Sequence, residues 1–324
     1  MMTTWSVTWG NALSNLRKHI ESVAIRQFKK TSQLYWMWEH RTMNTWDHTY
    51  AFNIYNRDTF TPTQATLVEW VTPEMDNQGF SQVTVQMTQF GRWVILTDIA
   101  VKDNPFDLYT EAAAELWRQM AEVVDQVVQT KLLTLDNTTQ TQVIYGANRA
   151  SRSAITSTDY AKSTYFANAN AILKSKWTPE IDSGYVAVAH PLVIQDLLTE
   201  VGSSTAGFFE AAKYSQPEKI FNGELGKMFG IRFVEASNIQ PISVTNGTTF
   251  NVYPTFLVGK YAYGVVESQA METIVKPIGS SWTEDPLNQR GSVGIKTRFW
   301  VEVLKPEANF RIETPVSLNP TLPY

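Results

Sequence analysis

The chain has 324 residues, of which 43% are hydrophobic and 18% are charged, and it contains no cysteine. This length allows one large domain or two ordinary ones, while the absence of cysteine excludes disulfides, thiolate catalysis and zinc–cysteine sites. A formal net charge of −4 argues against a general nucleic-acid-binding protein, which would need a basic excess.

The first 40 residues differ from the rest of the chain. Residues 12–30 carry apolar side chains three or four positions apart with basic residues between them, and this spacing predicts an amphipathic helix. A short helix is marginal alone, so we expect an arm that lies on a neighbouring subunit or on its own domain. We expect no signal peptide, because no cationic start precedes an apolar run, and no membrane span, because no apolar run reaches about 18 residues.

Residues 47–100 alternate between apolar and polar side chains, as strands do. The polar segment 72–81 contains Pro73 and Gly79, which are typical of turns. The pattern predicts a long antiparallel hairpin that would be marginal in isolation, because it has few core contacts of its own. The alternating runs are Tyr50–Ile54, Thr66–Val71, Gln82–Met87 and Arg92–Leu96.

Residues 104–135 predict a long helix. Asn104 is a favourable N-cap, Pro105 suits the first helical position, and an apolar stripe at helical spacing runs from Leu116 to Leu135. Such a helix would be about 45 Å long at ~1.5 Å per residue, several times the usual length. We therefore expect a spine against which other elements pack.

The second half mixes helices and strands. Residues 160–174 and the segment after His190-Pro191 read as helices, and 136–158 and 202–220 read as loops. Because these elements do not alternate strictly, the predicted class is α+β. The predicted strands are Tyr185–Ala189, Ile231–Glu235, Phe256–Val258, Tyr263–Val266, Glu272–Lys276, Val293–Leu304 and Phe310–Ile312.

No pattern of catalytic or metal-binding residues stands out. The four histidines lack metal-site spacing, and the segment GELGKM at 223–228 lacks the spacing and the Ser or Thr of a phosphate-binding loop. We interpret His190, at a strand-to-helix junction, as a helix cap or a buried imidazole rather than a catalytic base. We therefore expect no enzyme, no catalytic residue, no cofactor and no metal. An arm and a protruding hairpin are instead typical of joints between subunits, because their apolar faces need a partner.

Three segments of the second half carry a family likeness: GELGKMFGIRFVEASN at 223–238, TFLVGKYAYGVVE at 255–267 and KPIGSSWTEDPLNQRGSVGIKTRFWVEVL at 276–304. With these segments and the long helix, the chain resembles the major capsid proteins of tailed bacteriophages, of the large podovirus-type family with the Hong Kong phage-type capsid fold. The likeness spans roughly residues 45–313. Residues 1–40 and 202–216 contribute little to it.

The resemblance implies a domain plan. Residues 1–45 would be an N-terminal arm and 46–97 an extended β-hairpin loop, and 158–261 would form an axial domain. Residues 98–157 and 262–324 would form a peripheral domain that holds the spine helix. Gly291 and Gly294 would let the backbone turn sharply inside it.

The resemblance also implies self-assembly. Hexamers and pentamers of the chain would tile an icosahedral shell around double-stranded DNA, with portal, scaffold and decoration proteins as partners. Such a protein would be assembled in the host cytoplasm and located in the virion, without membrane contact. The alternatives are an encapsulin-like compartment shell, a tail or decoration protein, and a hydrolase using His190. The side chains expected to contact a neighbouring subunit are Trp36, Trp38, Phe60, Leu67, Trp70 and Phe80.

Overall fold

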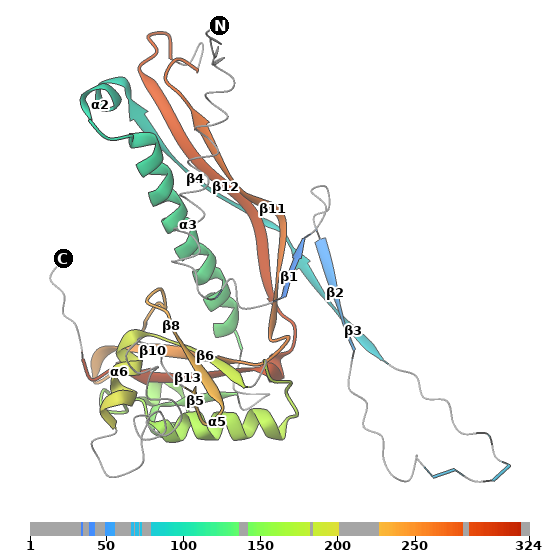
Figure 1. Cartoon of the computed structure of the whole chain (residues 1–324). Coiled ribbons are helices and arrows are strands. Elements are labelled where there is room, and N and C mark those ends of the chain that lie inside the picture. The colour runs from blue at the N-terminus through green and yellow to red at the C-terminus, as the bar shows by residue number, and fades with distance from the viewer. Residues whose placement is uncertain are drawn as a thin grey trace, which may run out of the picture.

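The computed structural model describes residues 34, 39–42, 49–55, 66–67, 69–70, 72, 79–135, 142–181, 184–200, 227–280 and 285–318. A tall upper body of sheet and helix stands on a wider lower body, and a hairpin projects from their junction (Figure 1). The helices are α2 (Asp98–Asp103), α3 (Leu108–Leu133), α5 (Ser163–Ser175) and α6 (Pro191–Thr199). The strands are β1 (Glu39–Thr42), β2 (Thr49–Tyr55), β3 (Phe80–Gln86), β4 (Thr88–Thr97), β5 (Val143–Tyr145), β6 (Tyr185–Ala189), β7 (Lys227–Met228), β8 (Ile231–Glu235), β9 (Ile242–Asn246), β10 (Thr248–Val258), β11 (Tyr263–Lys276), β12 (Arg290–Val303) and β13 (Asn309–Pro315).

The upper body is a sheet of order β1-β11-β12-β4 in the described part of the chain, with α3 against one face. Along β12, every second residue from Gly291 to Val301 is buried, as the two-residue period of a strand requires. Val293, Ile295 and Phe299 pack with the apolar stripe of α3. The Trp117 indole donates a buried hydrogen bond of 2.8 Å to the Thr273 hydroxyl, which ties α3 to β11 as well.

The predicted spine helix exists, but its predicted start was wrong. Asn104 does not cap α3; it ends α2 in an extended conformation with ψ 129°. Pro105 explains this, because a residue before proline is pushed away from helical ψ. The helix begins at Leu108, where the Asp107 carboxylate accepts from the Tyr109 amide, and ends at Leu133.

The predicted hairpin is formed by β2 and β3, which pair in antiparallel register from Thr49↔Gln86 to Tyr55↔Phe80. The strand expected at Thr66–Val71 was wrong for the residues described there, because Thr66 and Leu67 have no regular structure and Trp70 lies in a turn with φ 70°. β4 leaves the hairpin and pairs with β12 instead. A small apolar cluster of Phe52, Val85, Val266 and Leu304 fixes the base of the hairpin to β11 and the end of β12.

The lower body is a sheet of order β5-β13-β10-β6-β8-β7, with β9 beside β10, in the described part of the chain. Every residue of β6 is buried, which is the pattern of a strand covered on both faces. Val186 and Val188 pack in the cluster that contains α3, whereas Tyr185 and Ala187 pack in the cluster that contains α5 and α6. The two bodies therefore share one sheet as their boundary.

Buried polar contacts join α3 to the lower body. The Arg311 Nη1 group donates to the carbonyls of Leu132 (3.2 Å) and Leu133 (2.8 Å), which satisfies the C-terminal end of α3. The Arg311 Nε lies 2.6 Å from Glu313 Oε1 as an ion pair without hydrogen-bond geometry, and Arg152 binds both Glu313 oxygens at 2.6 Å. This charge cluster of Arg152, Arg311 and Glu313 fixes the end of α3 to β13 of the lower body.

The expectation that Gly291 and Gly294 form a sharp turn was wrong, because both lie inside β12. A β-carbon at Gly291 would overlap the Tyr109 hydroxyl, and one at Gly294 would lie 3.3 Å from the Trp93 β-carbon. These glycines make room for aromatic side chains. The turn comes earlier, where Asn288 has φ 55° and the Asp285 carboxylate accepts from the Arg290 amide at 2.6 Å.

Candidate assembly surfaces

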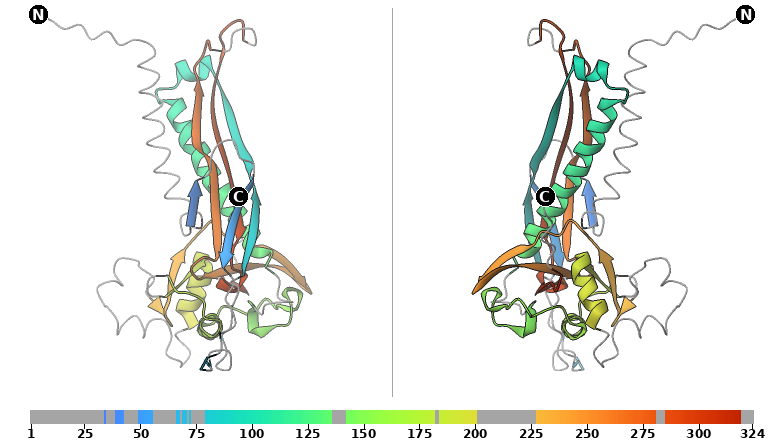
Figure 2. Two further views of the ribbon diagram at one scale, coloured as in Figure 1. Left: turned by 90° about the vertical axis from the view of Figure 1, so that its right-hand side faces the viewer. Right: turned by 90° about the vertical axis from the view of Figure 1, so that its left-hand side faces the viewer.

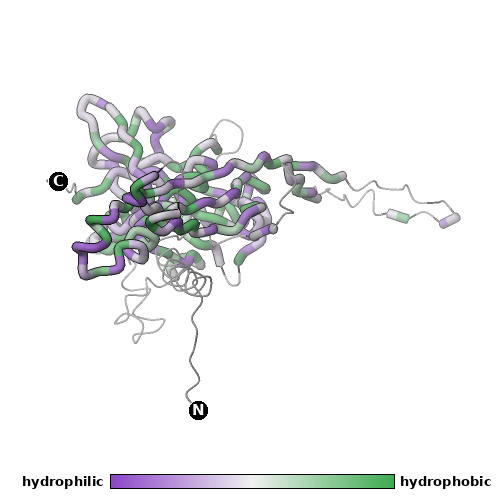
Figure 3. Tube along the Cα trace, turned by 90° about the horizontal axis from the view of Figure 1, so that it is seen from above, coloured by the Kyte–Doolittle hydropathy of each residue, from purple (hydrophilic) through white to green (hydrophobic). Residues whose placement is uncertain are grey.

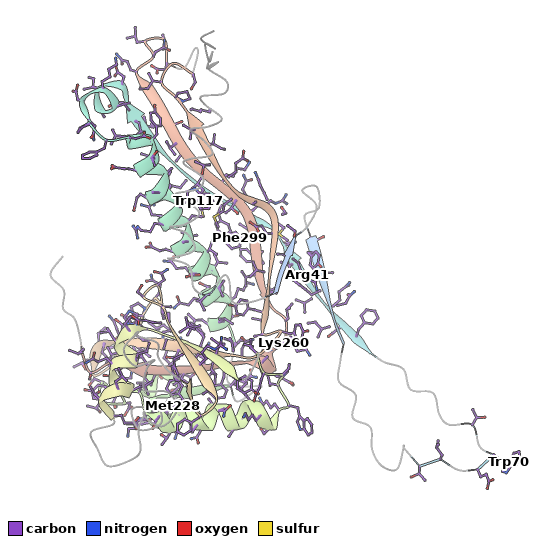
Figure 4. All side chains as sticks on the ribbon, in the orientation of Figure 1. Arg41, Trp70, Trp117, Met228, Lys260 and Phe299 are labelled. Carbon is purple, nitrogen blue, oxygen red and sulfur yellow. The ribbon has the colours of Figure 1, made fainter. Side chains whose placement is uncertain are left out.

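The loop that connects β2 to β3 carries large apolar side chains in water. Leu67 is 73% and Trp70 97% exposed in the loop, and Phe80, the first residue of β3, is 63% exposed (Figure 4 labels Trp70). The hairpin itself reaches well away from the body (Figure 3). Phe60, Trp36 and Trp38, the other predicted contact residues, lie outside the described residues, as does the predicted arm helix. The role of all six as subunit contacts stays a prediction.

A groove of about 480 Å³ lies on the face of the upper sheet opposite α3. Its floor follows from strand register: Gly294 in β12 stands between Trp93 in β4 and Ile274 in β11. Because Gly294 has no side chain, its two neighbours flank an open space, and Ile95 extends the exposed apolar surface. The groove could not be predicted from the sequence, since β4 lies far from β11 and β12 in the chain.

The groove and the loop have opposite charge. Three cationic side chains on the Trp93 face of the sheet line the groove, against the single carboxylate of Asp285; they are Lys276, Arg290 and Lys296. The loop segment, residues 56–79, contains one cation, Arg57. Its four carboxylates are Asp58, Glu69, Glu74 and Asp76. The groove is therefore matched to the loop both in apolar surface and in charge, which are the features that orient protein partners.

His190 is a helix cap, as the sequence suggested. Its Nδ1 accepts from the Leu192 amide at 3.2 Å, and its ring lies 4.5 Å from the Tyr253 ring between centroids. Burial lowers the pKa of His190 below its usual value, which keeps the imidazole neutral. A nitrogen that caps a helix has its lone pair engaged, so this geometry does not favour a catalytic base.

His190 should make folding sensitive to acid. Since the folded-state pKa is lowered, the unfolded chain binds a proton first, and stability present above about pH 6.5 is lost as pH falls through the folded pKa. In His190→Asn, the amide oxygen keeps the cap but does not titrate. We expect the free energy of unfolding in urea to fall more for the wild type than for this variant between pH 7.5 and 5. Equal losses would show that the cap does not respond to protons.

The described residues hold no cluster of three or more His, Asp or Glu side chains placed to bind a metal ion. Across the same residues, no helix has the length and apolar character needed to span a membrane.

Comparison with known proteins gives a family and a fold for the chain. A family model for phage capsid proteins matches residues 81–312. No curated protein matches the sequence. The structure is similar to the capsid of Ralstonia phage GP4, with TM-score 0.69, 15% identity and 88% of each chain covered. It is similar to the capsid of cyanophage P-SCSP1u, with TM-score 0.64, 14% identity and coverage of 87% of this chain and 88% of the other.

The fold is also similar to a virus-like particle from Pyrococcus furiosus, but less closely, with TM-score 0.53 and 11% identity over 91% of this chain and 98% of that one. The predicted α+β class with the Hong Kong phage-type capsid fold is confirmed by the phage likenesses.

Proposed function

The chain belongs to the phage capsid protein family, and from this premise we propose how it builds a shell. It is a major capsid protein of a tailed bacteriophage, a component of the virion. Its copies would associate into hexamers and pentamers that tile an icosahedral particle around double-stranded DNA. The observation that carries this proposal is the pair of matched surfaces, an exposed apolar acidic loop and an apolar basic groove.

We propose that the loop between β2 and β3 of one copy binds the groove of the next. Trp70 and Leu67 would leave water there beside Trp93, Ile95 and Ile274, at a gain of about 25 cal/mol per Å² of apolar surface. One such contact is modest. In a closed shell, however, each subunit is held by several neighbours at high effective concentration, so small contacts add up to a stable particle.

The domain division follows the same proposal. Residues 1–45 would be the arm, 46–97 the extended loop, 98–157 with 262–324 the peripheral domain, and 158–261 the axial domain. The separate apolar clusters around α3 and around α5 and α6 support two packed units. The buried junction at Arg311 favours their moving together.

The remaining roles are structural. We propose no catalysis, with portal, scaffold and decoration proteins as partners and assembly in the host cytoplasm. A net charge of −4 suits a wall that does not trap packed DNA. An encapsulin-like shell is the second candidate because of the likeness to the Pyrococcus particle, and its interior would hold enzyme cargo instead of DNA.

Charge reversal in the groove tests the loop contact. Lys276→Glu with Lys296→Glu should raise the protein concentration needed for particles by about tenfold or more, because it opposes an acidic loop with an acidic groove. The matched variant, Lys276→Arg with Lys296→Arg, keeps the charge and should assemble normally. Light scattering against concentration measures both, and normal assembly of the Glu variant would refute loop-to-groove docking.

A further inference from the structure

Four exposed or partly exposed aromatic side chains lie on left-handed backbone. Among the described residues, the non-glycine positions with positive φ include Trp70, Trp177, Phe229 and Tyr261. A bulky residue in this region is an uncommon and strained choice. Three of the four belong to the lower body: Trp177 is 76% exposed, Phe229 48% and Tyr261 40%. Backbone preference does not account for aromatic residues at these positions, and none of the three side chains is buried.

Trp177 occupies the position just past the end of α5. The Thr178 amide donates to the Leu173 carbonyl at 3.2 Å and the Trp177 amide to the Lys174 carbonyl at 3.0 Å. This is the helix-ending motif in which the left-handed residue is usually glycine. Here that residue has φ 54° and carries the largest side chain available.

Phe229 lies in a two-residue hairpin loop. Met228 pairs with Ile231, and Phe229 and Gly230 between them have φ 52° and 79°. Positive φ at both positions defines the turn for which Asn-Gly is the favoured sequence. Phenylalanine replaces the asparagine, although the Asn170 amide holds the Phe229 carbonyl in place at 2.6 Å.

The third position, Tyr261, lies in the turn from β10 to β11. Lys260 Nζ lies 5.2 Å and Lys305 Nζ 5.9 Å from the centre of its ring, so two cations flank the exposed aromatic. The Lys260 amide donates to the Pro179 carbonyl at 2.9 Å, next to the end of α5. At the Phe229-Gly230 turn, the Gly230 carbonyl accepts from the Tyr185 amide at 3.2 Å.

Trp177, Phe229 and Tyr261 all lie around the C-terminal half of α5: Trp177 follows its end, the Phe229 carbonyl binds Asn170, and the residue before Tyr261 binds Pro179. These three residues are here called the aromatic strip. The C-terminal end of α5 and the hairpin β2–β3 point to the same side of the molecule (Figures 1 and 2). A copy that receives the hairpin would stand on this side. The same neighbouring copy would therefore also face the aromatic strip.

Resting on the proposed function, we infer that the aromatic strip is a second contact surface for the same neighbouring copy of the chain. Exposed Trp and Tyr side chains are the residues that most often dominate the energy of an interface. Backbone strain in the free subunit persists where function requires a particular side chain at that place. The contact joins two different surfaces of identical chains, which is the arrangement that closes rings.

The test uses the opposite effects expected on folding and on assembly. In the variant Trp177→Gly with Phe229→Asn, each new residue prefers the backbone already present. We expect its Tm to equal or exceed that of the wild type, while the concentration needed for particle formation rises at least tenfold. Tyr160→Ser removes an exposed aromatic of the lower body that lacks positive φ, and should assemble as the wild type does.

The outcomes separate the two proposals. A stable variant that assembles poorly supports the strip as a contact. A variant that assembles at the wild-type concentration overturns it, and so does a variant with a lower Tm, since the aromatics would then serve the fold of their own chain. If the wild type forms no particles, both the proposed shell function and the role of the aromatic strip are refuted.

Discussion

A chain carrying Leu67→Ser and Trp70→Ser is expected to fold normally and to form no closed shells. Trp70 is 97% and Leu67 73% exposed, so their removal should change the free energy of unfolding by less than about 0.5 kcal/mol each. At an interface, a buried Trp commonly contributes about 2 kcal/mol or more. Since a shell repeats the contact in every copy, that loss should leave only subunits or small oligomers. Sedimentation velocity measures the assembly and urea unfolding measures the fold.

The matched control is Phe106→Ser with Leu318→Ser, which removes two exposed apolar side chains, 66% and 51% exposed, outside the loop. This control should form shells. If both variants lost them equally, general surface hydrophobicity rather than the loop would drive assembly. If the loop variant formed shells of normal size, the loop would not be needed for assembly.

Glu313→Gln is expected to destabilise the folded subunit by about 3–5 kcal/mol, the usual effect of breaking a buried ion pair. The Glu313 side chain has no exposed surface, and Arg311 beside it is 5% exposed. Without the carboxylate, the buried guanidinium would keep its bonds to the end of α3 but lose its counter-charge. The free energy of unfolding in urea provides the measurement.

Glu302→Gln is the control for this substitution. Glu302 pairs with Lys131 at 2.9 Å, but both side chains are 26% exposed, so the same change should cost less than about 1 kcal/mol. Similar losses in the two variants would show that the junction charges are no more important than a partly exposed pair. A small loss in Glu313→Gln would show that this charge cluster contributes little to joining α3 to the lower body.

Local patterns predicted the elements well. The apolar stripe of α3 and the alternation of β12 follow from periods of 3.6 and two residues, which neighbouring positions determine. The prediction of a loop over 136–158 was wrong at β5, and β9 was not predicted. Two other errors concern local signals that did not decide the structure. Asn104 is a good cap by type, but Pro105 forces it to be extended, and Thr66–Val71 has strand composition without strand structure in its described residues.

Surfaces formed by distant residues could not be predicted in this way. Arg311 meets carbonyls 178 and 179 positions earlier in the chain, and the groove combines residues of β4, β11 and β12. The aromatic strip left one trace in the sequence: Phe229-Gly230 directly precedes a predicted strand, as a hairpin turn does. Its left-handed backbone became visible only in the structure.

The most direct test of self-assembly is electron microscopy of the purified full chain over a range of concentrations. The account predicts closed particles of uniform diameter above a threshold concentration, with free subunits below it. A chain that stays monomeric at every concentration, with its loop against its own body, would contradict the account.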